Sequence, residues 1–276
     1  MTSPQSVVRV YDARIKRAQL LTTRLAFAAQ ILSFYQSVAS FQKNLSTHFA
    51  STRKSQPRSF PELARRDTLD LSNALPHVRS FLDMVEQTGP KRLADSAKQL
   101  SSSKAEVWLD ALNSYWQTGG HRNPSADAIE QFFLRAILQP CAEVVASEFP
   151  AREITETPKL CPMCGSQPLL GVLRPEGDGG KRFLLCSFCS HEWSFRRIFC
   201  PSCGEDTEAK LPVYVAEQFP HIRVEACETC STFLRTIDLT KDGHAVPLVD
   251  DLAALPLSLW AHEHNFSALQ SNLLGT

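Results

Sequence analysis

The feature that most constrains this chain is a run of four Cys-x-x-Cys pairs within 70 residues. The pairs are Cys161/Cys164, Cys186/Cys189, Cys200/Cys203 and Cys227/Cys230. The N-terminal residues Met1–Ser6 lack the basic and apolar segments of a secretory signal, so we expect a cytoplasmic protein. Thiols stay reduced in that compartment. This density of cysteines therefore predicts bound metal rather than disulfides.

The four pairs form an internal repeat of two units. Cys161-Pro-Met-Cys-Gly resembles Cys200-Pro-Ser-Cys-Gly, and the second pair of each unit follows after 21 or 23 residues. A tight turn places both thiolates of a pair on one side, and Gly165 and Gly204 suit the positive φ that often follows such a turn. The repeat thus favours two sequential tetrahedral sites, and two metal ions per chain. The predicted ligands are Cys161, Cys164, Cys186 and Cys189 in one site, and Cys200, Cys203, Cys227 and Cys230 in the other.

Two questions about these sites stay open at the level of sequence. A cross-braced arrangement, in which the first pair joins the third, would use the same residues. Zinc and iron both accept four sulfur ligands, so the ligand set does not distinguish them. A thioredoxin-type redox pair is disfavoured, because such a pair begins a helix after a strand, whereas these pairs lie in Gly- and Pro-containing turns.

Other candidate residues carry less weight. Cys141 falls on an apolar helical face and is expected in the core. Asp250-Asp251 could be a carboxylate pair for acid–base chemistry, but two acids better suit the solvated start of a helix. The sequence has no phosphate-cradling glycine loop, serine-nucleophile elbow or His-Glu-x-x-His motif, which disfavours chemistry on a small substrate.

Periodicity divides the chain into a helical part and a ribbon part. An apolar stripe from Leu21 to Ala39 predicts a helix over about residues 8–49. Further helices are expected over residues 75–89, 91–100 and 105–117, and from a cap at Asn123–Ser125 to about Phe149, with a kink at Pro140. Short β-type runs then follow, the longest over Trp193–Phe199 and Thr232–Asp238.

The expected fold class is α+β, with a helical N-terminal domain followed by two small four-cysteine metal modules and a short C-terminal helix. The modules are of the rubredoxin-like or zinc-ribbon kind. The expected boundaries are 1–155 for the helical domain, 156–197 and 198–245 for the two ribbons, and 246–276 for the C-terminal segment.

Charge and hydropathy argue against two classes of partner. The 29 basic and 29 acidic residues cancel, and residues 156–240 carry 9 basic and 11 acidic residues. Two divalent ions with eight thiolates would bring this ribbon part to a charge of about −6, which repels phosphate, so nucleic acid is not expected. The longest uncharged run, Leu25–Gln42, is too polar for a lipid-facing helix, so membrane insertion is not expected either.

Several stretches carry a family resemblance. They are Cys186-Ser-Phe-Cys-Ser-His-Glu-Trp193, Val224-Glu-Ala-Cys227-Glu-Thr-Cys230, Val249-Asp-Asp-Leu-Ala-Ala-Leu and Asn272-Leu-Leu-Gly. Their order resembles the FdhE family of formate dehydrogenase accessory proteins over about residues 155–275, and more loosely over the helical half. The resemblance implies a cytoplasmic, non-enzymatic maturation factor. It would bind the catalytic subunit of a respiratory formate dehydrogenase and be needed for assembly or activation of that subunit. The resemblance also favours iron, with zinc as the other possible metal.

Two rival functions stay open: a rubredoxin-like protein that delivers electrons or sulfur, and a zinc-ribbon protein that binds nucleic acid. For the accessory function, a client-binding face is expected among the aromatic and arginine side chains in and between the cysteine pairs, with a strand alternation that packs one face in the ribbon core and exposes the other. These are Phe188, Trp193, Phe195, Arg196 and Arg197.

Overall fold

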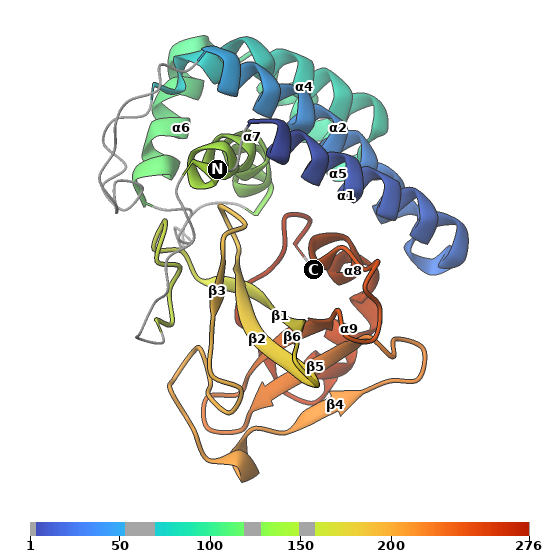
Figure 1. Cartoon of the computed structure of the whole chain (residues 1–276). Helices are drawn as coiled ribbons and strands as arrows, with labels where there is room; N and C mark the ends of the chain where they lie inside the picture. Colours follow the sequence, from blue (N-terminus) through green and yellow to red (C-terminus); the bar gives the residue numbers. More distant parts are fainter. Residues whose placement is uncertain (1–3, 53–69, 119–127, 149–157, 276) are drawn as a thin grey trace. The chain divides into compact units, whose positions relative to one another are not determined.

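The computed structural model describes residues 4–52, 70–118, 128–148 and 158–275 (Figure 1). By its internal contacts the chain divides into two compact units, Met1–Ala151 and Arg152–Thr276. No helix in these described stretches is long and apolar enough to cross a membrane.

The first unit is helical. Its helices are α1 (Pro4–Arg24), α2 (Ala29–Thr52), α4 (Leu75–Thr88), α5 (Lys91–Leu100), α6 (Ala105–Thr118) and α7 (Ala128–Ser147), with 3-10 turns η1 (Ala26–Ala28) and η2 (Leu71–Ala74). Helix α7 is at the core, because all its side chains from Phe132 to Ala146 are buried. The Phe81 ring of α4 packs against Phe132 and Phe133 with centroid distances of 5.9 and 6.0 Å.

The predicted single helix over residues 8–49 is wrong. The chain leaves helical geometry at Leu25 (φ −122°, ψ 84°) and turns back, so that α1 and α2 lie antiparallel. Gln36 donates to Thr22 across this pair. No glycine or proline marks the break, and folding back lets the apolar stripes of α1 and α2 cover each other.

The other helices, which are expected from helix-breaking and capping residues, are confirmed. Helices α4, α5 and α6 begin and end within a residue of the predicted bounds. Pro76 lies in the first turn of α4, and Gly89 caps its end. Pro140 lies inside α7, and the expected cap at Asn123–Ser125 falls outside the described residues.

The second unit is built on a seven-stranded sheet within its described residues. The strands are β1 (Pro168–Glu176), β2 (Gly179–Cys186), β3 (Glu192–Ser194), β4 (Val213–Val215), β5 (Ile222–Cys227), β6 (Thr232–Asp238) and β7 (Ser267–Ala268). Their order is β3-β2-β1-β6-β5-β4, with β7 beside β6. The two halves of the sequence repeat correspond to β1–β3 and β4–β6, each an antiparallel three-stranded ribbon.

The two ribbons share one sheet, because β1 pairs with β6 in parallel. Gly171 of β1 lies opposite Thr236 of β6, and a Cβ at Gly171 would collide with the Thr236 side chain. The repeat gives no sign of this joining in the sequence. The expected boundaries 156–197, 198–245 and 246–276 stay predictions.

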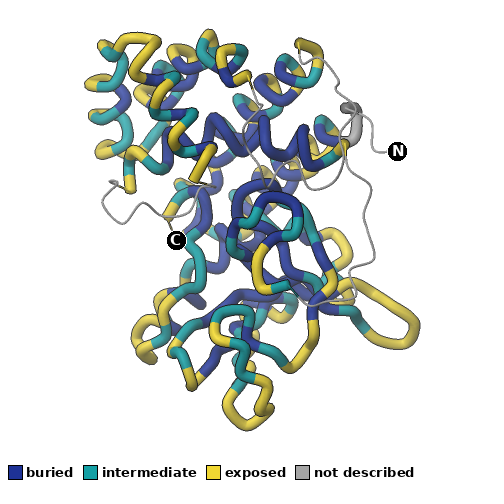
Figure 2. Tube along the Cα trace, turned by 90° about the vertical axis from the view of Figure 1, so that its left-hand side faces the viewer, coloured by how far each residue is buried: buried dark blue, intermediate teal, exposed yellow. Residues whose placement is uncertain are grey.

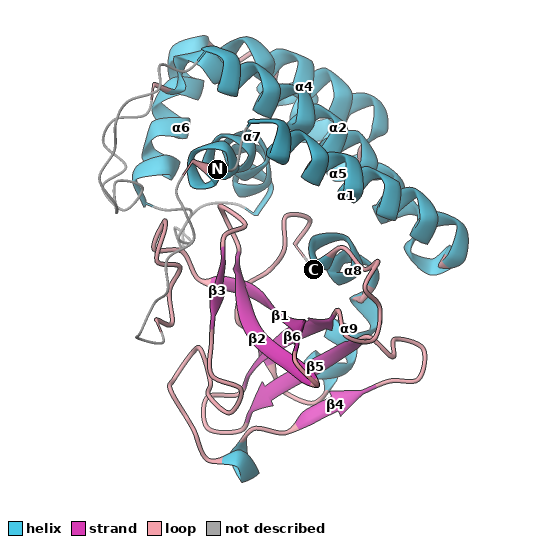
Figure 3. Cartoon of the chain, viewed as in Figure 1, coloured by secondary structure: helices cyan, strands magenta, loops and turns pink. Residues whose placement is uncertain are grey.

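One face of the sheet is covered by the C-terminal helices α8 (Pro247–Ala253) and α9 (Leu255–Glu263). The Tyr214 ring of β4 lies 4.7 Å from the Trp260 ring of α9. Figure 2 shows exposed residues in the loops of the second unit and on the outer sides of the helices of the first. Six of the seven residues of β6 are buried. Figure 3 shows that the strands belong to the second unit, while the longer helices belong to the first.

Candidate metal centre

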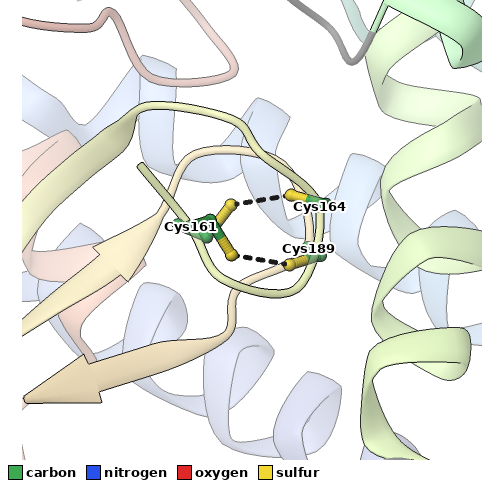
Figure 4. Close-up of side chains that lie close together, drawn as sticks. Cys161, Cys164 and Cys189 are labelled. Carbon is green, nitrogen blue, oxygen red and sulfur yellow. Dashed lines mark hydrogen bonds between the residues drawn. The ribbon is translucent and has the colours of Figure 1, made fainter. Parts of the chain in front are cut away.

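The first cysteine cluster consists of Cys161, Cys164, Cys186 and Cys189, whose sulfurs all lie within 4.8 Å of one another. The Sγ atoms of Cys161 and Cys189 are 3.7 Å apart, and those of Cys164 and Cys186 are 3.4 Å apart. Figure 4 shows the side chains of Cys161, Cys164 and Cys189 turned toward one another. All four residues are buried.

The second cluster consists of Cys200, Cys203, Cys227 and Cys230, again with all sulfurs within 4.8 Å. The Sγ atoms of Cys200 and Cys230 are 3.7 Å apart, and those of Cys203 and Cys227 are 3.6 Å apart. Cys203 is exposed and Cys230 is half-buried. The grouping of both clusters is therefore sequential, as the repeat predicts, and the cross-braced alternative is not formed.

These separations fit a tetrahedral ion. Four sulfurs placed 2.3 Å from a tetrahedral centre lie about 3.8 Å from one another. A disulfide would require about 2.05 Å. The four Sγ–Sγ separations given above, 3.4–3.7 Å, are close to the first value and far from the second. The donor set is four soft sulfurs, which suits zinc and iron equally.

Each cysteine pair is held by a turn that ends in a left-handed residue. Gly165 (φ 73°) and Gly204 (φ 92°) follow the first pair of each ribbon, as expected. Ser190 (φ 54°) and Ser231 (φ 53°) occupy the same position after the second pairs. Serine rarely adopts this conformation, so sequence reasoning identified the two glycines and missed the two serines.

The backbone around the first pair of each ribbon follows one hydrogen-bonding scheme. Cys161 N donates to Ser166 O and Gly165 N donates to Cys161 O, both at 2.8 Å. In the second ribbon Cys200 N donates to Glu205 O at 2.8 Å, and Gly204 N to Cys200 O at 3.0 Å. The repeat of the sequence is thus a repeat of backbone geometry.

Thiols within one cluster differ in pKa. In the first cluster, hydrogen bonds from Cys161, Cys186 and Cys189 hold the pKa of Cys164 well below its usual value, whereas burial raises the pKa of Cys186 and Cys189. In the second, burial raises the pKa of Cys227 to about 12. Burial also opposes ionisation of Cys230, but hydrogen bonds with Thr232 and Cys227 lower its pKa to about 6. Four thiolates in either cluster would require a cation.

The expectation of a solvated helix start at Asp250-Asp251 is wrong, because both side chains are at most 1 % exposed. Asp251 accepts two hydrogen bonds from Arg235 of β6, at 2.6 and 3.1 Å, and a third from Asn272 at 2.9 Å. Ser258 of α9 also contacts Arg235. This buried network connects β6 to both C-terminal helices and to the last residues of the chain.

Asp250 points to different partners, so the two acids do not form a catalytic pair. Its Oδ1 lies 2.9 Å from His221 Nε2, and its Oδ2 accepts from Val246 N at 2.8 Å. His221, Asp242 and Asp250 are close enough to hold an ion, a grouping that sequence reasoning missed. The hydrogen bonds of Asp250 already give it a structural role without an ion. Cys141 is buried in α7, as expected.

The expected client-binding face between the cysteine pairs is not formed as predicted. Phe188, Trp193 and Phe195 are all buried, with at most 5 % exposure. Strand β3 ends at Ser194, so the strand alternation assumed over Trp193–Phe199 does not continue. Arg196 and Arg197 are exposed, and Arg197 donates to Gly180 O at 2.6 Å.

Comparison with known proteins places both cysteine clusters in named family segments. Residues 160–197 match the family model "FdhE, central domain", and residues 198–274 match "FdhE, C-terminal domain". A relative from Haemophilus ducreyi, named Protein FdhE homolog, is 33% identical over 93% of this chain and 86% of its own length. The chain belongs to the FdhE family. A second FdhE homolog, from Aquifex aeolicus, is 27% identical over 91% of this chain and 88% of its own length.

A solved FdhE structure shares the fold. The crystal structure of the FdhE protein from Pseudomonas aeruginosa matches with a TM-score of 0.69 and 24% identity, over 97% of this chain and 95% of that one. The predicted family is confirmed by the relative from Haemophilus ducreyi. The predicted α+β fold class, with its helical N-terminal part and two four-cysteine clusters, is confirmed by the structure and its fold neighbour.

Proposed function

We propose that this protein is an accessory factor for formate dehydrogenase and that its eight clustered cysteines hold two metal ions. The observation that carries the metal assignment is the sulfur spacing of 3.4–3.7 Å in both clusters. The proposed ligands are Cys161, Cys164, Cys186 and Cys189 for one ion, and Cys200, Cys203, Cys227 and Cys230 for the other. Membership of the FdhE family supports the link to formate dehydrogenase.

In this proposal the protein acts in the cytoplasm on the catalytic subunit of a respiratory formate dehydrogenase, and it is not itself an enzyme. The metals stabilise the ribbons, since a closed four-thiolate site contributes folding free energy directly. Iron is the favoured metal and zinc the alternative. The ligand geometry accommodates both ions, so the choice rests on the family resemblance.

The experiment that tests the proposed partner is co-purification under reducing and anaerobic conditions. The tagged full-length chain is co-expressed with the untagged catalytic subunit, and recovery of that subunit is measured. We expect specific recovery that is lost in a variant with Cys161→Ser and Cys164→Ser, and kept in the exposed control Arg174→Gln. Absence of the subunit from the parent complex would overturn the proposed partnership.

The electron-carrier alternative is favoured by one observation, the exposed Cys203 of the second cluster, because electron transfer requires access to the metal site. Activation of the client by chains loaded only with zinc, which has no redox chemistry, separates the two functions. We expect zinc-loaded and iron-loaded chains to bind the subunit equally. Binding or activation by the iron-loaded chain alone would favour electron delivery.

A further inference from the structure

The two cysteine clusters differ in how far solvent reaches their sulfurs. In the first cluster no cysteine is more than 3 % exposed. In the second, Cys203 is exposed and Cys230 is half-buried, although Cys200 and Cys227 are buried. One cluster is therefore closed on every side and the other is open on the side of Cys203 and Cys230.

The difference follows from the residues between the cysteines. Met163 and Phe188 occupy these turns in the first ribbon, and both are buried, at 2 % exposure. The same positions of the repeat hold Ser202 and Thr229 in the second ribbon. Ser202 is half-buried, while Thr229 is exposed and donates to Glu205 at 2.6 Å. Two large apolar side chains that shield the sulfurs in the first ribbon are thus replaced by two small polar side chains in the second.

A pocket of about 70 Å³ lies next to the second cluster and includes Cys200 and Cys227 in its lining. Three arginines and one acid also line it: Arg182, Arg197, Arg223 and Glu225. Glu225 accepts from Arg182 at 2.6 Å and from Arg223 at 3.0 Å, and it is the one carboxylate among three guanidinium groups in the lining. In addition, the Nε atom of Arg182 is buried with no hydrogen-bond partner in the described structure.

Although the ribbon part as a whole is acidic, an anion that enters this pocket meets three guanidinium groups and one carboxylate, so the charge next to it is locally positive. A basic pocket with apolar walls raises the local concentration of an anionic ligand. Phe233 and Leu234 supply apolar lining here, and both are buried. A small anionic chelating group held in the pocket would lie beside Cys200 and Cys227, and the ion itself would be reached through the open side of the cluster at Cys203 and Cys230.

We propose that the second cluster is the site at which metal enters and leaves the protein, while the first cluster keeps its ion. The incoming ligand is an anionic chelating group, which the arginine pocket guides to the second cluster. This inference rests on the proposed role of the eight cysteines as ligands. The step is ligand exchange without redox chemistry. A donor atom of the incoming anion binds the ion as one protein thiolate leaves and takes a proton from water, and the oxidation state of the metal is unchanged.

Release kinetics from the zinc-loaded full-length chain test the proposal. With EDTA in excess, one ion should leave at least about tenfold faster than the other, because a closed site must open locally before a chelator reaches it. Cys203→Ser should abolish the fast phase and leave one slowly released ion. A single rate for both ions, or a fast phase that survives Cys203→Ser, would overturn the proposal. A parent chain that binds no zinc would instead contradict the proposed function, in which the eight cysteines are metal ligands.

The guiding role of the pocket has its own test. Arg223→Gln should slow the fast phase with anionic EDTA by about two- to fivefold, the effect of one partly exposed charge. Release by neutral 1,10-phenanthroline should be unchanged. Arg174→Gln is the matched control, because Arg174 is exposed, pairs with Glu192 and does not line the pocket. Equal slowing with both chelators, or no slowing with EDTA, would refute guidance by charge.

Discussion

At the scale of single residues, buried thiols in both clusters keep their protons until a cation binds. Burial raises the pKa of Cys186 and Cys189, and raises that of Cys227 to about 12, so these three thiols hold protons at neutral pH. Metal binding must displace those protons, because thiolates are the ligands. The metal-free chain therefore holds more protons than the metal-bound chain.

Metal affinity should accordingly rise with pH. At pH 7 we expect at least two protons to be released at the first site and at least one at the second, since the three named thiols are protonated there. Calorimetric zinc titrations in two buffers of different ionisation enthalpy measure this number. Equal affinities at pH 6 and pH 8 would show that thiol deprotonation is not coupled to binding.

A second prediction at this scale concerns the buried pair of Arg235 and Asp251. Asp251→Ala should lower the free energy of unfolding by about 3–5 kcal/mol, because it leaves the Arg235 guanidinium buried without its carboxylate. Urea unfolding of the metal-loaded chain measures the loss. The control is Glu192→Ala in the exposed pair with Arg174, where about 0–1 kcal/mol is expected. Similar losses in the two variants would show that burial of the Arg235–Asp251 pair does not increase the cost of removing its carboxylate.

At the scale of elements, helix-breaking and turn residues made most helices and ribbons predictable from the sequence. Pro76 and Gly89 bracket α4, and Pro90 precedes α5 directly. The four cysteine pairs gave the grouping of both clusters because each turn is local. The break at Leu25 could not be predicted, since no helix-breaking residue lies there.

Long-range features were the ones that sequence reasoning missed. The parallel pairing of β1 with β6 joins residues 65 positions apart, as at Gly171 and Thr236, and leaves no local pattern. Asp250 and Asp251 looked solvated because their partners, such as His221 and Arg235, are far away in the sequence. The aromatic residues Phe188 and Trp193 looked like an interface, but a small ribbon needs them for its core.

The joint between the ribbons gives a prediction at this scale. Gly171→Ala should lower the stability of the second unit by about 1–3 kcal/mol, because the added methyl group meets the Thr236 side chain in a packed sheet. Gly179→Ala is the control, since its nearest neighbour is 4.0 Å from the new Cβ and its φ is not positive. Thermal unfolding of both variants measures the difference, and an unchanged Gly171→Ala chain would show that the β1–β6 joint is loose.

At the scale of the whole molecule, the two units have separate cores. The helical unit has α7 and the Phe81 cluster, whereas the second unit has a small sheet and two cysteine clusters. Metal binding should therefore contribute to the folding of the second unit alone.

Removal of metal should unfold the sheet and spare the helices. Prolonged treatment with a chelator under reducing conditions should abolish β-sheet ellipticity, while far-UV helical ellipticity largely persists. Because the ribbons share one sheet, both should lose order when both ions are gone. Loss of all helical ellipticity on chelation would mean that the helical unit depends on the metal ribbons.

The central claim is that eight cysteines in two four-sulfur clusters hold two metal ions. Elemental analysis of the anaerobically purified full-length chain tests it most directly. We predict two ions, of iron or zinc, per chain, and one ion per chain in Cys203→Ser. A parent chain that contains one ion or none under these conditions would contradict the claim.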